Sequence, residues 1–267
     1  MIYLRSVSID ARTGAYPFSC PALSALERID FAPVTIIVGE NGSGKSTLLE
    51  ALARLMRLPA LGAADAGSDD TLSSVQPLCE AMRPVFSRRP RLGMFLRAED
   101  FFGYTRRIAA LQSDMRAELR RVDEEYAGAS AFTRAQARMA FAGSLYELER
   151  AHGRDPDARS HGESFLHMFG ERIHDGGLYI LDEPEAPLSP LRQLALIELI
   201  MQREARSQFI IATHSPMLTA YPGAAIWSFD HAPARRVEYG ELDSVRLLRD
   251  FLNAPERFMR SLRDGQT

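Results

Sequence analysis

The chain has 267 residues, a formal net charge of −3, 46% hydrophobic and 25% charged residues, which is ordinary for a globular protein with a full α/β core. The charge balance does not indicate nucleic-acid binding, and two cysteines without motif spacing fit a reducing cytosol better than a disulfide scaffold. No apolar run approaches the ~20 residues of a membrane span, and MIYLRSVSID lacks the features of a signal peptide, so we expect a cytoplasmic protein with no membrane partner.

The N-terminal part predicts strands that lead to a loop and a helix. Residues 2–9 alternate in the manner of a first strand, and Val34–Val38 is a mostly β-branched run typical of a buried parallel strand. Residues 46–58, rich in Leu, Ala and Arg, predict a helix that Pro59 ends. Small polar residues over 60–77 indicate a surface loop.

The loop between that strand and helix contains Lys45, the only lysine among the 32 basic residues. Gly39, Gly44, Lys45 and Ser46 fit the phosphate-loop pattern G-x-x-x-x-G-K-[ST], in which backbone N–H groups and the lysine hold phosphates and the hydroxyl ligates Mg²⁺. A chance glycine-rich turn is the alternative. The predicted nucleotide-binding residues are Gly39, Glu40, Asn41, Gly42, Ser43, Gly44, Lys45, Ser46 and Thr47.

The middle of the chain predicts a helical hairpin. Residues 91–102 indicate a strand that runs into a loop, and residues 104–151 are helical apart from a break at 128–130. The second arm is expected over 133–152. The first arm has an apolar stripe at spacings of three and four, made of Ile108, Leu111, Met115, Leu119, Val122 and Tyr126.

The C-terminal part resumes the core. We expect a helix after Ser160, strands at 178–181, 208–212 and 225–229, a helix at 191–203 and a single helix at 243–262.

Acidic residues follow the first of these strands. Asp182 and Glu183 come directly after the apolar run in GLYILDEPEAPLSP. Beside a phosphate loop, Asp182 is expected to hold Mg²⁺ and Glu183 to deprotonate the attacking water. The alternative is a strand end followed by a turn.

A histidine follows the next strand. His214 lies just beyond Phe209–Ala212, and ligands of open α/β sheets bind outside the carboxyl ends of the strands. The phosphate loop, Asp182/Glu183 and His214 should therefore share one edge, where His214 can reach a γ-phosphate. A structural histidine that caps a strand is the alternative.

The segment SHGES opens a predicted helix. Ser160 and Glu163 fit a capping box, and a helix N-terminus opened by Ser and Gly also offers N–H groups to an anion.

Taken in order, these motifs resemble the ABC-type ATPase head, whose signature is Leu-Ser-Gly-Gly-Gln. Ser160 and Gly162 match it, whereas His161 and Glu163 depart from it. The resemblance implies an α/β P-loop NTPase with a mostly parallel sheet and a helical lobe inserted between the phosphate loop and the signature. The expected parts are 1–95 and 160–267 for the core and 96–159 for the lobe.

The run DEPEAPLSP is similar to soluble, non-transporter ABC ATPases of the SMC, RecF and OLD type. The family's signature binds the γ-phosphate held by the other subunit, which implies that Ser160, Gly162 and Glu163 act in trans in a homodimer around ATP and Mg²⁺. Transporters have a glutamine near the metal, and the resemblance implies that Glu99 or Asp100 in RAEDFF takes its place. The alternative is a plain surface acidic pair. Tyr16 could stack on adenine or pack in the core.

The sequence thus predicts an ATP-hydrolysing dimer that switches an unidentified protein partner or a DNA transaction. A transporter subunit and a non-hydrolysing ATP-sensing adaptor are the alternatives. DNA binding stays open because of a basic stretch made of Arg83, Arg88, Arg89, Arg91, Arg97, Arg106 and Arg107.

Overall fold

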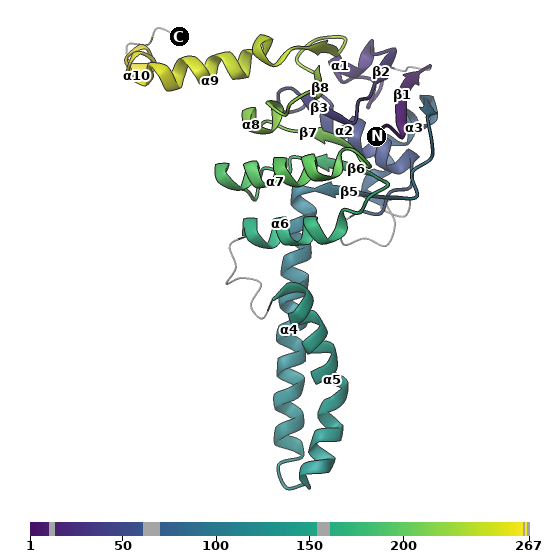
Figure 1. Ribbon diagram of the computed structural model, residues 1–267, viewed down its shortest axis with the longest axis vertical. Coiled ribbons are helices and arrows are strands. Elements are labelled where there is room, and N and C mark those ends of the chain that lie inside the picture. The colour runs from purple at the N-terminus through teal and green to yellow at the C-terminus, as the bar shows by residue number, and fades with distance from the viewer. Residues whose placement is uncertain (11–13, 61–69, 154–160, 264, 266–267) are drawn as a thin grey trace.

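The computed structural model describes residues 1–10, 14–60, 70–153, 161–263 and 265. Its centre is a six-stranded sheet in the order β5-β6-β7-β3-β8-β9 (Figure 1). Strands β5, β6, β7, β3 and β8 pair in parallel with their neighbours, and β9 pairs antiparallel to β8. The bounds are β3 Val34–Val38, β5 Leu92–Arg97, β6 Gly177–Asp182, β7 Gln208–Ala212, β8 Ala225–Ser228 and β9 Arg235–Val237.

A second, antiparallel sheet has the order β2-β1-β4. It is formed by β1 Leu4–Ile9, β2 Arg28–Asp30 and β4 Met82–Phe86. The predicted first strand therefore exists but lies outside the parallel sheet. The segment predicted as a loop is partly helical, because η2 Asp70–Val75 and α3 Gln76–Ala81 precede β4. Residues 61–69 of that segment lie outside the described residues.

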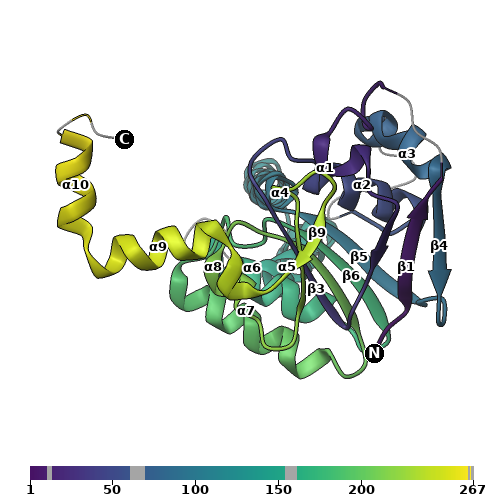
Figure 2. The same ribbon diagram turned by 90° about the horizontal axis from the view of Figure 1, so that it is seen from above.

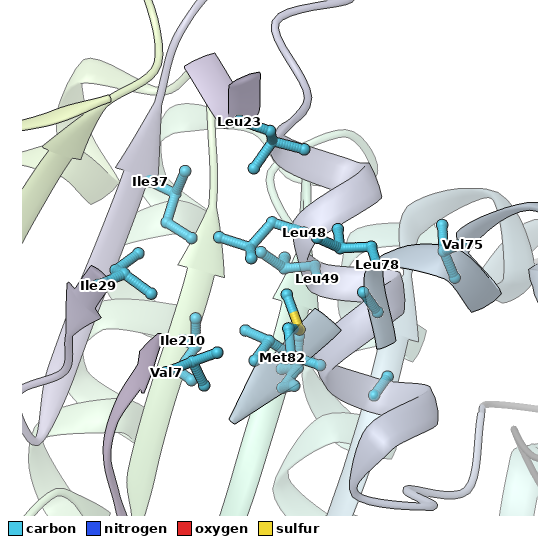
Figure 3. Packing of buried hydrophobic residues seen from close by; sticks show 14 of the residues in the cluster. Val7, Leu23, Ile29, Ile37, Leu48, Leu49, Val75, Leu78, Met82 and Ile210 are labelled. Atoms are coloured by element: carbon cyan, nitrogen blue, oxygen red, sulfur yellow. The ribbon is translucent and has the colours of Figure 1, made fainter. Parts of the chain in front are cut away.

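One face of the parallel sheet packs on α2, which spans Lys45–Leu55, and on the antiparallel sheet. Figure 3 shows Ile37 of β3, Ile210 of β7 and Leu48 of α2 pointing toward one another, with Val7 of β1 beside them. All four side chains are buried. Burial of such side chains contributes about 1.5–3 kcal/mol each, and here it fixes α2 directly behind the loop that it follows.

The opposite face packs on α6, His161–Arg172, and α7, Pro190–Arg203. Phe165 and Phe169 of α6 are buried with Leu196 and Ile200 of α7 in a single cluster against the sheet. Since side chains alternate along a strand, the β-branched runs predicted as strands cover both faces.

A long helical hairpin projects from the body (Figure 1). It consists of α4, Ala98–Glu125, and α5, Ala131–His152, so the expected loop before the first arm is in fact helix. The predicted apolar stripe is only partly correct. Ile108 and Val122 are buried, but Leu111 is 45% exposed, and the buried neighbour is Gln112, whose Nε2 donates to the carbonyl of Gly153.

The C-terminal segment reaches away from the body as two helices and not one (Figure 2). α9 spans Asp243–Asn253, α10 spans Pro255–Arg263, and the break falls at Ala254, the residue before a proline. Two short helices complete the list, α1 Pro21–Ser24 and α8 Pro216–Thr219, with η3 at Tyr239–Glu241. Within the described residues, none of the helices is long and apolar enough to cross a membrane.

Candidate nucleotide-binding site

The loop between β3 and α2 has the backbone of an anion cradle. Gly39 and Gly44 have φ angles of 151° and 102°, a region that favours glycine. A Cβ on Gly39 would lie 2.9 Å from Ser43 Oγ, and one on Gly44 would lie 3.1 Å from the Cβ of Cys20. The loop therefore requires glycine at both positions. It directs the N-terminus of α2 toward the space that the loop encloses.

Lys45 opens α2 and turns its amine back over the loop. Its Nζ donates to the carbonyl oxygens of Gly39 at 2.6 Å and Glu40 at 3.0 Å, and the side chain is 4% exposed. Burial lowers the pKa of Lys45, while the nearby carboxylates Glu183 and Asp182 act to raise it. The only lysine of the sequence thus places a compact ammonium group inside the loop.

Asp182 ends β6 behind the loop. Its side chain is hydrogen-bonded to Ser46, and its Oδ1 is buried without a hydrogen-bond partner. Burial raises the pKa of this carboxyl to about 7, the bond to Ser46 acts to lower it, and the charges of Glu183 and Glu50 raise it further. A buried carboxylate beside a hydroxyl, with a free oxygen, has the donor set that Mg²⁺ prefers.

Glu183 adopts a strained backbone, with a φ of 49° that non-glycine residues seldom adopt. Its N–H donates to the carbonyl of Ala212 on β7, which anchors the turn to the next strand. The side chain points outward, 44% exposed, with Oε1 3.6 Å from Nε2 of His214. The structure therefore brings the predicted base and the predicted histidine together at one edge.

The candidate metal ligand Glu99 lies farther out, in the first turn of α4. It is 76% exposed, and its Oε1 is 3.6 Å from Nε of Arg97. Arg97 also pairs with Asp100 at 2.8 Å and with Glu50 at 3.5 Å, and its side chain is 12% exposed. Arg97 is thus mostly buried and forms ion pairs within the protein. This member of the predicted basic stretch is therefore a poor candidate for DNA contact.

Two acidic residues beside the site were not predicted from the sequence. Glu50 lies one turn after Ser46 on α2, and its charge acts on the pKa of Asp182. Asp230 follows β8, and its Oδ1 accepts from the N–H of Glu40 at 2.7 Å. A spacing of i,i+4 from the loop serine and a carboxylate after a strand are the signals that could have found them.

The signature-like segment is only partly described. Ser160 lies outside the described residues. Gly162 is buried in the first turn of α6, where a Cβ would lie 2.9 Å from the carbonyl of Pro187 and 2.7 Å from Cδ of Arg192. Glu163 Oε1 accepts from Arg192 at 2.6 Å. Within its own chain, this helix start packs against the segment that follows Glu183.

Tyr16 lies beside the loop and not in the core. It is 47% exposed, and its hydroxyl is 3.2 Å from Oγ1 of Thr47. An exposed ring on the rim of the loop leaves room for a planar ligand to stack.

Two family models match the chain. A model described as "AAA domain" matches residues 22–56, which contain the phosphate loop. A model described as "AAA domain, putative AbiEii toxin, Type IV TA system" matches residues 164–220, which contain Asp182, Glu183 and His214. The two segments together cover about a third of the chain. They coincide with the two halves of the site, which the parallel sheet brings to one edge.

The chain has a mixed α/β fold with a mostly parallel central sheet and a phosphate-loop motif between β3 and α2. The phosphate loop follows the central strand β3, and the acidic end of β6 lies two strands away, a strand order that the sequence did not predict.

Several solved structures align with most of the chain at low sequence identity. The Smc head domain of Pyrococcus furiosus, bound to the C-terminal domain of ScpA, is 13% identical, covering 98% of this chain and 100% of that one, with a TM-score of 0.43. A nucleotide-free ATP-binding cassette of an ABC transporter is 18% identical, covering 96% and 97%, with a TM-score of 0.48. The SMC head domain from Thermotoga maritima is 13% identical, covering 89% and 100%, with a TM-score of 0.39. None of the curated proteins matches this chain.

The raised pKa of Asp182 predicts how the stability of the protein responds to pH without metal. The carboxyl titrates at about 7 when folded against 3.8 when unfolded, so between these values the folded chain binds more protons than the unfolded chain. Stability should therefore fall as pH rises from about 5 to about 7, by up to roughly 1.4 kcal/mol per unit. Urea unfolding of wild type and Asp182→Asn over this range measures the effect.

Asp182→Asn should lack this component, because its amide does not ionise, and Mg²⁺ should stabilise wild type more at pH 8 than at pH 6. Identical pH slopes for the two proteins would contradict the assignment of a buried, protonatable Asp182.

Proposed function

We propose that the protein binds and hydrolyses ATP at the loop edge of its parallel sheet, using Lys45, Ser46, Asp182, Glu183 and His214. The observation that carries the proposal is the convergence of three strand ends: Ser46 is hydrogen-bonded to Asp182 behind the loop, and Glu183 meets His214 beside it.

Each side chain then has a distinct role. Ser46 and Asp182 would hold Mg²⁺, which supplies neutralisation of phosphate charge when bound. Lys45, released from Gly39 and Glu40, would reach the β- and γ-phosphates. Glu183 would accept the proton of the attacking water, and His214, 3.6 Å away, would orient that carboxylate or contact the γ-phosphate.

The remaining loop residues follow from the same geometry. The N–H groups of residues 39–47 would surround the phosphates, and the exposed ring of Tyr16 is a candidate for the adenine. Glu99 remains a weaker candidate for a metal contact, because it faces solvent and Arg97.

The resemblance to ABC-type heads extends the proposal to a homodimer around two MgATP. Ser160, Gly162 and Glu163 of one copy would contact the γ-phosphate held by the other, and hydrolysis would loosen the pair. This cycle would take place in the cytoplasm and would switch a protein partner or a DNA transaction.

Light scattering tests the dimer. Glu183→Gln should be monomeric or weakly associated without nucleotide and a compact dimer with MgATP, because the bound γ-phosphate is not lost. Ser160→Arg added to it should keep the chain monomeric while MgATP still binds. An active wild-type protein that stays monomeric with MgATP would contradict the dimer and reduce the proposal to a single-copy ATPase.

A further inference from the structure

A large cavity joins the phosphate loop to the C-terminal helices. It has a volume of about 1350 Å³. One wall holds Asn41, Gly42, Ser43 and His214 of the nucleotide site. The other wall is an apolar surface on α9 and α10, which we call the arm face and which consists of Leu247, Leu248, Phe251, Phe258 and Leu262.

Much of the arm face is exposed in the described part of the chain. The rings of Phe251 and Phe258 meet edge to face at 5.7 Å and join the two helices. Leu247 and Leu262 are 60% and 61% exposed. In α9 only Val245 is buried, and α10 has no buried residue. Both helices project from the body (Figure 2), and several of their apolar side chains are exposed in the described part of this chain.

The root of the arm is nevertheless attached to the body. Val245, Leu248 and Leu252 line a second cavity together with Leu194 of α7 and Met217 of α8. These residues attach α9 to the body beside the phosphate loop, whereas Leu262 near the end of α10 is exposed.

Charge favours an acidic occupant. Residues 243–263 contain five arginines and three carboxylates, a net charge of +2. The whole chain has a net charge of −3, which leaves −5 for the remainder. A second copy of the body therefore carries charge opposite to that of the arm.

We propose that the arm face binds a second copy of this chain, which enters the cavity between the arm and the phosphate loop. This inference rests on the proposed function, since the copy that completes the nucleotide site must approach the wall formed by Asn41, Gly42 and His214. That copy then touches the arm on the opposite wall. By two-fold symmetry each arm holds the other body, so one dimer buries two arm faces.

A basic amphipathic helix pair also suits an anionic membrane surface. The second copy is favoured because the arm face and the phosphate loop line the same cavity. A flat bilayer could not enter that cavity, whereas a second protein copy could.

The test introduces one glutamate into α10 of the Glu183→Gln protein, either on the arm face or beside it. Leu262→Glu changes a residue that lines the cavity, and Met259→Glu changes a residue on the same helix that is 48% exposed and is not part of the cavity wall. Sedimentation gives the dimer dissociation constant with MgATP, and fluorescent ATP gives the affinity of each chain for nucleotide. Both positions are exposed, so the variants should fold.

We expect Leu262→Glu to raise the dissociation constant at least tenfold while leaving ATP affinity unchanged, and Met259→Glu to change neither. If Glu183→Gln itself binds MgATP and stays monomeric, the dimer of the proposed function fails. If it dimerises and Leu262→Glu dimerises equally well, the arm inference alone fails. Binding of wild type to phosphatidylserine vesicles that Leu262→Glu abolishes, with dimerisation intact, would assign the arm to lipid and overturn the inference.

Discussion

Replacing Lys45 with alanine should abolish tight ATP binding and leave the fold intact. Hydrogen bonds to charged groups contribute about 1.5–3 kcal/mol each, so losing contacts to two phosphates should weaken binding on the order of 10²- to 10⁴-fold. Among the described residues the amine donates hydrogen bonds to loop carbonyls alone, and its burial disfavours the charged form. Isothermal titration with MgATP measures the affinity, and thermal unfolding measures the fold.

Lys45→Arg is the matched control for charge. Its planar guanidinium cannot replace an ammonium that fits 2.6 Å from the carbonyl of Gly39 inside the loop, so binding should fail here as well. Retention of wild-type affinity by either variant would show that the phosphates bind elsewhere.

Replacing Glu183 with glutamine should separate binding from turnover. The amide keeps the shape of the side chain but does not accept a proton from water, so kcat should fall about 10²- to 10⁴-fold. ATP should remain bound, since Lys45 and the loop glycines are unchanged. Phosphate release and the nucleotide retained after gel filtration measure the two properties on one sample.

Glu99→Gln serves as the control, because Glu99 is the other carboxylate predicted near the metal and is 76% exposed. It should keep most of the activity. If Glu183→Gln hydrolyses ATP at the wild-type rate and Glu99→Gln does not, the base has been assigned to the wrong strand end.

The local parts of the site could be predicted because their signals are contained in short segments. The glycines of the loop follow from backbone geometry that few residues adopt, and Gly39 and Gly44 have positive φ angles. The strand before the loop and the strand Gln208–Ala212 have the predicted bounds. A parallel sheet then places Glu183 and His214 at one edge regardless of the intervening helix.

The parts that depend on register or on distant contacts were not predicted. The ion pair between Arg97 and Glu50 joins β5 to α2, and β5 pairs with β6 in a register that places Arg97 opposite Asp182. The sequence encodes neither alignment locally. The strand at residues 4–9 gives the same alternation whether it joins the parallel sheet or a separate one. The C-terminal helix pair was predicted as one helix because its apolar period continues across Pro255.

The central claim is that this loop edge hydrolyses ATP, and the most direct test is magnesium-dependent phosphate release by the purified wild-type chain. We predict steady release that EDTA stops, that Lys45→Arg and Glu183→Gln both lose, and that rises more than proportionally with protein concentration if two copies complete each site. Absence of release from a folded, ATP-binding protein, or equal release from Lys45→Arg, would contradict the account.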